Sequence, residues 1–211
     1  IDEYRGTSVE CLYLGIERLA MQGLVGVRIG FGTGGEWKGP PIINYAGVAR
    51  DDTSAFTDIA LLSMCKFFVG PGSGVQWCAM AFNRPVCLIN AFPWPWTETP
   101  MRSDSVVIPK KYWVRKENRF LTIHEAVLLE KDMHWKRFYD KKSTDRLGLD
   151  IIPNSSEEIS SAMIEINDRL NHCWMGDSFP IRNFFKDHNM CQHSKAYLGS
   201  GFATLNRHLL Q

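Results

Sequence analysis

One stretch of the sequence, FFVGPGSGVQWCAMAFNRPVCLIN (residues 67–90), carries the signals on which the expected fold rests. It opens with a short apolar run typical of a buried strand, expected over residues 66–69. A glycine-rich bend at residues 70–74 follows, then a helix over 73–82 and a second apolar strand over 86–90. A strand, a helix and a strand in this order predict a parallel β-α-β unit.

Helix and strand signals also alternate in the preceding part of the chain. Thr7 and Ser8 can cap a helix that runs to about Gln22, where Gly23 ends it. We expect a buried strand over residues 24–31, a second strand over 42–45 and a helix over 55–64. This order predicts an α/β fold with a parallel sheet and crossover helices.

The second half of the chain gives weaker signals. A strand is expected over residues 105–108, and Thr122 with Glu125 has the spacing of a capping box before a helix to about Glu130. Residues 154–156 start a strong amphipathic helix that runs through Leu170. A last helix is expected to close the chain over residues 197–210.

Composition and charge exclude several classes of protein. The 211 residues include 24 Lys plus Arg against 23 Asp plus Glu, which indicates no general affinity for nucleic acid. No apolar run is long enough to span a membrane. Six cysteines without a CxxC pair indicate reduced thiols and hence a cytoplasmic protein. We expect residues 1–211 to form one domain, and the start at Ile1 suggests a fragment of a longer chain.

The glycine-rich bend is the first candidate site. In an open parallel sheet, ligands collect at the carboxyl ends of strands, where helix N-termini point N–H groups outward. Gly70, Gly72 and Gly74 leave the backbone uncovered and Ser73 adds a hydroxyl donor, so a diphosphate fits the bend. The alternative is a tight strand-to-helix turn with Ser73 as its N-cap. The bend matches neither GxGxxG nor a phosphate-binding loop that ends in a lysine.

Several charged residues are further candidates. Arg28 ends a predicted buried strand, where its charge needs either an anionic ligand or a carboxylate in a structural salt bridge. Asp58 either faces the bend or is a solvated helix residue. Glu157 and Glu158 complement a helix dipole, or one of them contacts a ribose hydroxyl.

Two clusters complete the candidates. The proline-rich FPWPW (residues 92–96) is expected to form an ordered loop, in which Trp94 and Trp96 either stack on sugar rings or pack against the protein. Histidines and cysteines late in the chain match no standard zinc spacing, so no metal site is expected. These are His172, Cys173, His188, Cys191 and His193.

Four segments resemble, in this order, a family of proteins assigned as bacterial glycosyltransferases, which are often fused to tetratricopeptide repeats. They are RGTSVECLYLGIERLAMQGLVGVRIG (5–30), FTDIALLSMCKFFVGPGSGVQWCAMAFNRPVCLIN (56–90), IIPNSSEEISSAMIEINDRL (151–170) and FATLNRHLL (202–210). The central segment also resembles the donor site of heptosyltransferases and, more distantly, of fucosyltransferases.

The resemblance implies a GT-B architecture, in which two Rossmann-like domains with helices on both faces of their sheets oppose each other. This chain would be the C-terminal, donor-binding domain, and the acceptor domain would lie before Ile1. Arg28 would be the catalytic cation, and Gly72 stands where related sequences often carry a polar residue. The residues that would bind the nucleotide-diphosphate sugar are Gly70, Gly72, Ser73, Gly74 and Asn90.

The hypothesis from the sequence is therefore a metal-independent glycosyltransferase domain without a cofactor, which transfers a sugar to a glycan or other hydroxyl acceptor, as in cell-surface polysaccharide biosynthesis. The bend and Arg28 would stabilise negative charge on the leaving nucleotide. One alternative is a non-catalytic carbohydrate-binding or scaffolding module of the same fold, with residues 92–96 as its recognition surface. Another is a phosphoryl-sugar epimerase of related two-domain fold.

Overall fold

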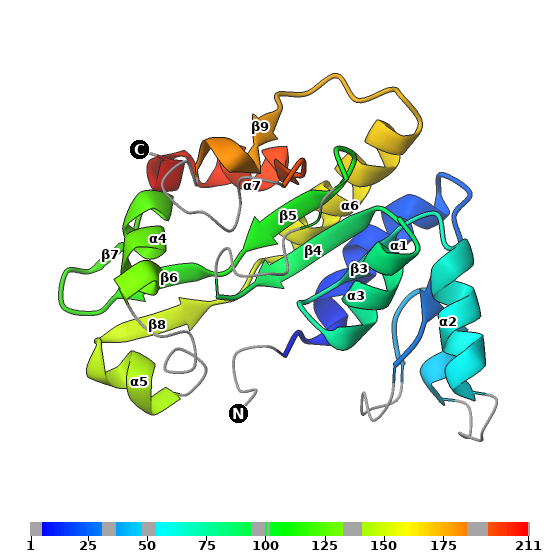
Figure 1. The fold of residues 1–211 in the computed structure, drawn as a ribbon, viewed down its shortest axis with the longest axis horizontal. Helices are drawn as coiled ribbons and strands as arrows, with labels where there is room; N and C mark the ends of the chain where they lie inside the picture. The colour runs from blue at the N-terminus through cyan, green and yellow to red at the C-terminus, as the bar shows by residue number, and fades with distance from the viewer. Residues whose placement is uncertain are drawn as a thin grey trace.

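The computed structural model describes residues 6–30, 37–47, 54–93, 100, 102–132, 141–184 and 194–210. At its centre is a five-stranded sheet in the order β3-β4-β5-β10-β9, in which the first four strands are parallel and β9 is antiparallel (Figure 1). The strands are β3 (Phe68–Gly70), β4 (Val86–Ala91), β5 (Val106–Pro109), β10 (Tyr197–Leu198) and β9 (Phe179–Pro180). Helices flank this sheet, so the predicted α/β class with a mostly parallel sheet is confirmed.

Residues 67–90 form the predicted β-α-β unit. β3 and β4 pair in parallel, with Phe68 beside Val86 and Gly70 beside Leu88, and α3 (Gly74–Ala81) connects them. All six residues of β4 are buried, which is typical of a parallel strand with both faces covered. The apolar run in this stretch therefore specifies a central strand.

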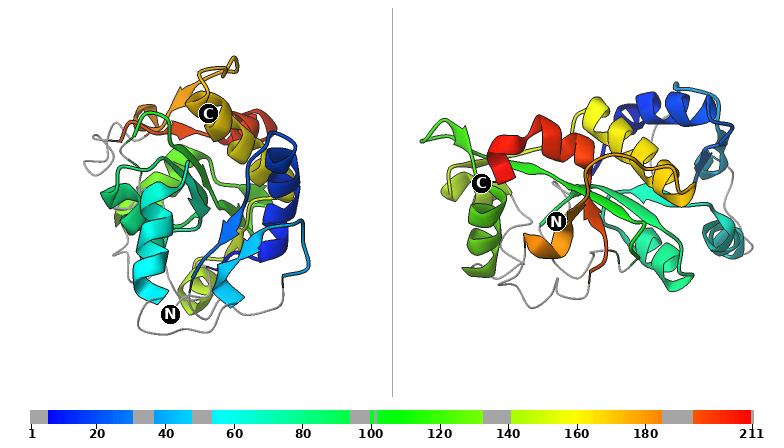
Figure 2. Two further views of the ribbon diagram at one scale, coloured as in Figure 1. Left: turned by 90° about the vertical axis from the view of Figure 1, so that its right-hand side faces the viewer. Right: turned by 90° about the horizontal axis from the view of Figure 1, so that it is seen from above.

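Helices lie on both sides of the central sheet (Figure 2). One side carries α1 (Tyr13–Ala20), α6 (Ser156–Leu170) and α7 (Ser200–Leu205), and the other carries α3 with α2 (Ser54–Met64) beside it. α1 lies close to α6 because Gly15 has no side chain: a Cβ at this position would collide with the sulfur of Met163. Short 3₁₀ turns also occur, namely η1 (Val9–Leu12), η2 (Tyr45–Gly47), η4 (Ile181–Asn183) and η5 (Arg207–Leu210).

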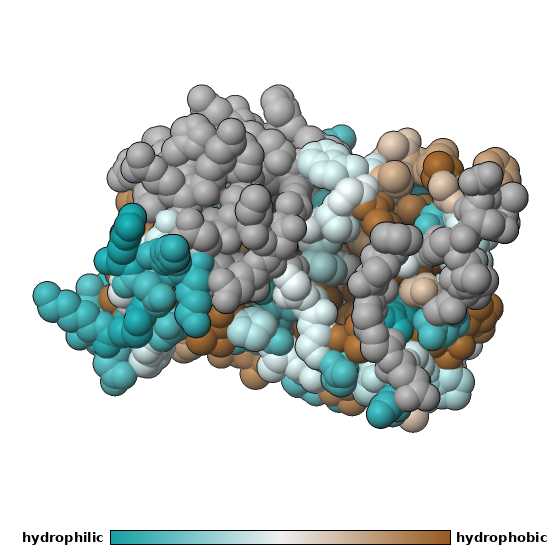
Figure 3. Space-filling model, turned by 90° about the horizontal axis from the view of Figure 1, so that it is seen from below, coloured by the Kyte–Doolittle hydropathy of each residue, from teal (hydrophilic) through white to brown (hydrophobic). Residues whose placement is uncertain are grey.

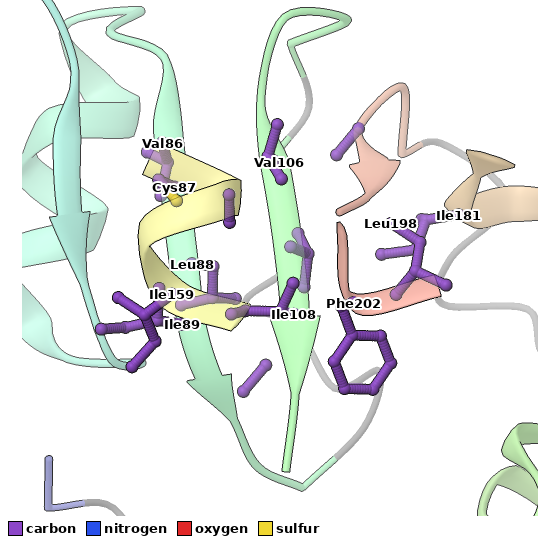
Figure 4. Close-up of a cluster of buried hydrophobic side chains, with 14 of the residues drawn as sticks. Val86, Cys87, Leu88, Ile89, Val106, Ile108, Ile159, Ile181, Leu198 and Phe202 are labelled. Carbon is purple, nitrogen blue, oxygen red and sulfur yellow. The ribbon is translucent and has the colours of Figure 1, made fainter. Parts of the chain in front are cut away.

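The core between the sheet and the helices α6 and α7 is apolar (Figure 4). Ile159 of α6 and Phe202 of α7 are buried in one cluster with Ile89 of β4 and Ile108 of β5. These side chains come from segments far apart in the sequence, so the cluster joins the β-α-β unit to the C-terminal helices.

Two helices start with a capping box, and the box at Thr122 and Glu125 was predicted from the sequence. At the start of α6 the Glu158 amide donates to the Ser155 hydroxyl at 3.2 Å, and the Ser155 amide donates to the Glu158 carboxylate at 2.7 Å. Thr122 and Glu125 make the same reciprocal pair, at 3.2 and 2.7 Å, at the start of α4 (Ile123–Asp132). Local sequence therefore defines both helix starts.

A separate three-stranded antiparallel sheet in the order β7-β6-β8 lies between β5 and α6 in the sequence, and it was not predicted. It consists of β6 (Lys111–Val114), β7 (Arg119–Phe120) and β8 (Leu149–Ile152). β6 pairs with β8 although β7, α4 and α5 (Lys141–Arg146) lie between them in the sequence. Such a long-range pairing leaves no local sequence signal, whereas the turn before β7 contains Asn118 at φ 51°, a conformation that asparagine tolerates.

The predicted buried strand at residues 24–31 is wrong in extent and in burial. β1 (Val27–Arg28) contains two residues and pairs with β2 (Ile43–Asn44) in a separate two-stranded sheet. Val27 is 40% exposed and Ile43 is 57% exposed. Because these two residues are register partners, they lie side by side on a face open to solvent. An apolar sequence did not suffice for burial here.

The predicted closing helix over residues 197–210 is also wrong at its start. Tyr197 and Leu198 form β10 because they pair with Val106 and Val107 of β5. α7 then begins at Ser200. Pairing with a distant strand therefore outweighs the helical periodicity of this segment.

The surface character varies along the face that Figure 3 shows. Figure 3 shows hydrophobic areas on the half that carries α2 and α3, where Phe56, Met64 and Trp77 are among the exposed side chains, and hydrophilic side chains on the half with the antiparallel sheet. In the described part of the chain no helix combines the length and apolar composition needed to cross a bilayer. The five cysteines in the same part of the chain form no disulfide with one another.

Replacing Ile159 with alanine should lower the free energy of unfolding by about 2–5 kcal/mol, because it leaves a cavity beneath α6. The matched change Ile59→Ala on α2, where the side chain is 44% exposed, should cost less than about 1 kcal/mol. Urea unfolding of both variants measures the difference. Equal losses would contradict the described core.

Candidate functional site

The candidate site lies where β3 ends and α3 begins. β3 ends at Gly70, and Ser73 is the N-cap residue of α3, with extended backbone angles of φ −157° and ψ 168°. The Ser73 side chain makes no capping hydrogen bond to the helix. Ser73 therefore has the N-cap position that the alternative of a tight strand-to-helix turn predicts, but not the side-chain bond of a cap.

The glycines of the bend are not required by backbone conformation. None of Gly70, Gly72 and Gly74 has a positive φ, so the turn itself would tolerate other residues. At Gly70 packing within the protein excludes a side chain, because a Cβ would lie 2.7 Å from the ring of Phe68. At Gly74 a Cβ would meet no atom within 4 Å. The missing side chain of Gly74 therefore opens the start of the helix to the outside.

The N-terminus of α3 differs from those of α6 and α7 in its electrostatics. The first turn of α3 contains no acidic residue. The first turn of α6 contains Glu157 and Glu158, and at the start of α7 the Ser200 amide donates to the Glu165 carboxylate at 2.6 Å. These two helices have carboxylates at their N-termini, whereas the first turn of α3 has none, so the positive end of its dipole has no acidic side chain of its own first turn beside it.

Arg28 lies in a different sheet from the bend. It is the second residue of β1, which pairs with β2 and not with β3. Its guanidinium carbon lies 5.8 Å from the centre of the Trp37 ring, a cation–π distance. Arg28 is therefore a strand-end cation as expected, but its joint action with the bend on one ligand stays a prediction.

Asn90 has a structural role at the end of β4. The Asn90 amide N–H donates to Asn154 Oδ1 at 2.7 Å, and the Asn154 amide N–H donates to Asn90 Oδ1 at 2.6 Å. Asn90 Nδ2 donates to Thr7 Oγ1 at 3.2 Å, and Asn154 Nδ2 donates to the Pro109 carbonyl at 2.6 Å. Asn90 is only 3% exposed, so these bonds occupy it within the protein and we do not retain it as a ligand contact.

The two glutamates considered for a ribose contact are also occupied. Glu157 accepts two hydrogen bonds from Arg18, at 2.9 and 3.1 Å. Buried Glu158 accepts from Lys111 Nζ at 2.7 Å and from Asn206 Nδ2 at 2.6 Å, in addition to its capping bond. Both carboxylates therefore stabilise the protein itself.

The remaining candidates do not add to the site. Asp58 lies half-buried on α2. The described residues contain no group of three or more side chains suited to hold a metal ion, and Cys173 bonds to Asp168 instead. Some predicted positions lie outside the described residues, namely Trp94, Trp96, His188, Cys191 and His193.

Lys110 is a residue that sequence reasoning missed. It follows β5 directly, at the carboxyl edge of the parallel sheet, and is only 6% exposed. Its amine donates to the Gly6 carbonyl at 3.3 Å. Burial lowers the pKa of this amine, and burial raises the pKa of the nearby Cys11 thiol to about 11. A lysine placed directly after an apolar strand was the available signal.

Comparison with models of protein families, with curated proteins and with solved structures finds no match to this chain.

Ser73→Ala should change the free energy of unfolding by less than about 0.5 kcal/mol, because the hydroxyl makes no capping bond. Ser155→Ala is the matched control at a helix start with a full capping box, and it should cost about 0.5–2 kcal/mol. Thermal and urea unfolding measure both changes. A loss at Ser73 as large as that at Ser155 would show that Ser73 is an ordinary cap.

Proposed function

We propose that this chain is the nucleotide-sugar-binding domain of a glycosyltransferase with a Rossmann-like, GT-B type architecture. The observation that carries the proposal is the uncapped start of α3 at Gly74, at the carboxyl end of β3. Ligands of open parallel sheets bind at such strand ends. The described fold, a mostly parallel sheet flanked by helices, is compatible with this architecture.

The diphosphate of the donor would occupy the bend. The amides at the start of α3 and the Ser73 hydroxyl would donate to its oxygens, and the open space beside Gly74 would admit its bulk. Lys110 also follows a strand at this end of the sheet, but it is buried and its amine bonds to the Gly6 carbonyl, so we do not count it among the ligand contacts. The site therefore matches a ligand with two phosphate groups better than a neutral sugar.

The proposed reaction is the transfer of the sugar to a hydroxyl. The acceptor oxygen attacks the anomeric carbon, the bond from this carbon to the diphosphate oxygen breaks, and its electron pair leaves with the diphosphate. The N–H groups of α3 and the Arg28 guanidinium would stabilise this developing charge. A base in a further domain, before Ile1, would accept the proton of the acceptor hydroxyl.

Calorimetry with ADP, GDP and UDP tests the binding step. The chain should bind at least one of them, and Ser73→Asp should weaken that binding at least tenfold, about 1.4 kcal/mol, because its carboxylate takes the position of the ligand's charge. Aspartate is a good N-cap, so the melting temperature should not fall. Binding of equal strength in the parent and the Ser73→Asp variant would refute the proposed site.

Arg28→Ala should weaken nucleoside diphosphate binding by about 1.5–3 kcal/mol, the range for a hydrogen bond to a charged group, and leave binding of the bare nucleoside nearly unchanged. Arg115→Ala, in the antiparallel sheet where Arg115 pairs with Asp145 and Asp150, is the matched control and should bind both ligands as the parent does. If Arg28 is instead part of a structural salt bridge, Arg28→Ala will melt earlier and lose no selectivity for the diphosphate.

A further inference from the structure

A small hollow lies at the amino ends of β4 and β5, whereas the Gly74 bend lies at the carboxyl end of β3. Figure 1 shows where these two strands begin. Its cavity volume is about 70 Å³, room for one small polyatomic group. The lining residues are Met80, Asn83, Arg84, Pro100, Arg102 and Ser105. Two of the six are arginines, and one of them, Arg102, is paired with the Asp104 carboxylate.

Arg102 forms a fixed wall of this hollow. Its Nε and Nη2 donate to the Asp104 carboxylate at 2.8 and 2.5 Å, and its Nη1 donates to the Asn83 carbonyl at 3.1 Å. These bonds tie the segment before β5 to the turn after α3. Arg102 is therefore already paired and holds the shape of the hollow.

Arg84 is not paired in this way. Its Nε is buried and has no hydrogen-bond acceptor among the described residues. Arg84 follows the last turn of α3, whose carbonyl ends attract its charge, but this attraction supplies no acceptor for the Nε–H group. A water molecule would satisfy that group and leave the charge uncompensated, whereas an anion would do both.

Ser105 supplies a second donor. Its side chain is fully buried, and its hydroxyl oxygen accepts the Val86 amide at 3.1 Å. A hydroxyl can donate as well as accept, so Ser105 has a proton to offer once its side chain turns toward the hollow that the residue lines. One charged donor and one neutral donor therefore line the same small space.

We propose that this hollow binds a small oxyanion, a single phosphate, sulfate or carboxylate group, through the Arg84 guanidinium and the Ser105 hydroxyl. Both residues line the hollow. A small turn of each side chain on binding exposes the donors, because Arg84 Nε and Ser105 are otherwise buried. The planar guanidinium suits an oxyanion because its N–H groups match the spacing of two oxygens. The bound group would join the end of α3 to the start of β5. The site lies at the other edge of the sheet from the Gly74 bend, so it does not depend on the proposed glycosyltransferase function.

The test follows the arginine Nε–H resonances of the ¹⁵N-labelled chain by NMR while inorganic phosphate is added. The Arg84 resonance should shift in a saturable way, with a dissociation constant of roughly 1–10 mM. The Ser73→Asp variant should give the same titration, which separates this site from the bend. Acetate, added in a parallel titration, distinguishes a carboxylate ligand from a tetrahedral one, and saturable binding of either anion supports the proposal.

The variant Arg84→Lys keeps the positive charge but loses the planar set of guanidinium N–H donors, so it should weaken phosphate binding about tenfold. The shift of the Ser105 amide resonance measures binding in this variant. Arg115→Lys is the matched control and should bind as the parent does. An Arg84 resonance that does not move with either anion, or moves without saturating, overturns the proposal. The parent titration decides this even if Arg84→Lys fails to fold.

Discussion

The burial of β4 is the constraint on which the arrangement of the molecule depends. All six of its residues are buried, and it pairs in parallel with β3 on one edge and β5 on the other. An apolar strand of this kind requires helices on both of its faces. α3 supplies one cover and α6 the other, and the carboxyl ends of β3, β4 and β5 are thereby brought to one edge of the sheet. Near the end of β4 the backbone of Asn90 has a φ of 50°. Two hydrogen bonds with Asn154 satisfy the Asn90 amide N–H and side-chain oxygen there.

The helices α3 and α6, which begin at this end of the sheet, differ in the residues at their N-termini. α6 is capped by Ser155 and carries two glutamates in its first turn, one of which, Glu158, is buried and fully bonded. α3 begins with Gly74 and carries no acid in its first turn. A sequence that optimised only stability would cap α3 as well, because a cap is worth about 1 kcal/mol. The difference gives the proposed anion site its physical basis.

The sequence predicted the parts of the fold that local chemistry determines. The glycine-rich bend located the β-α-β unit, the spacing of Thr122 with Glu125 located the start of α4, and residues 154–156 located the start of α6. The strands β9 and β10 were missed because each has two residues and exists only through pairing with a neighbour. β1 was expected to be buried because Val27 is apolar, but burial depends on what packs over a strand, which its own sequence does not encode. The same holds for the candidate site. The glycine-rich bend could be predicted from neighbouring residues, whereas the pairing of Asn90 with Asn154, 64 residues away, could not.

The most direct measurement of the central claim is the ¹H–¹⁵N spectrum of the chain during a titration with the nucleoside diphosphate that binds best. A phosphate at the open helix start should move the amides of Gly74, Val75 and Gln76 downfield, since hydrogen bonding to an anion deshields them, and should leave the capped start of α6 at Ser156–Glu158 unchanged. Saturable shifts confined to the first group are the predicted result. Binding that leaves Gly74 and Val75 unmoved, or that shifts both helix starts alike, would contradict the account.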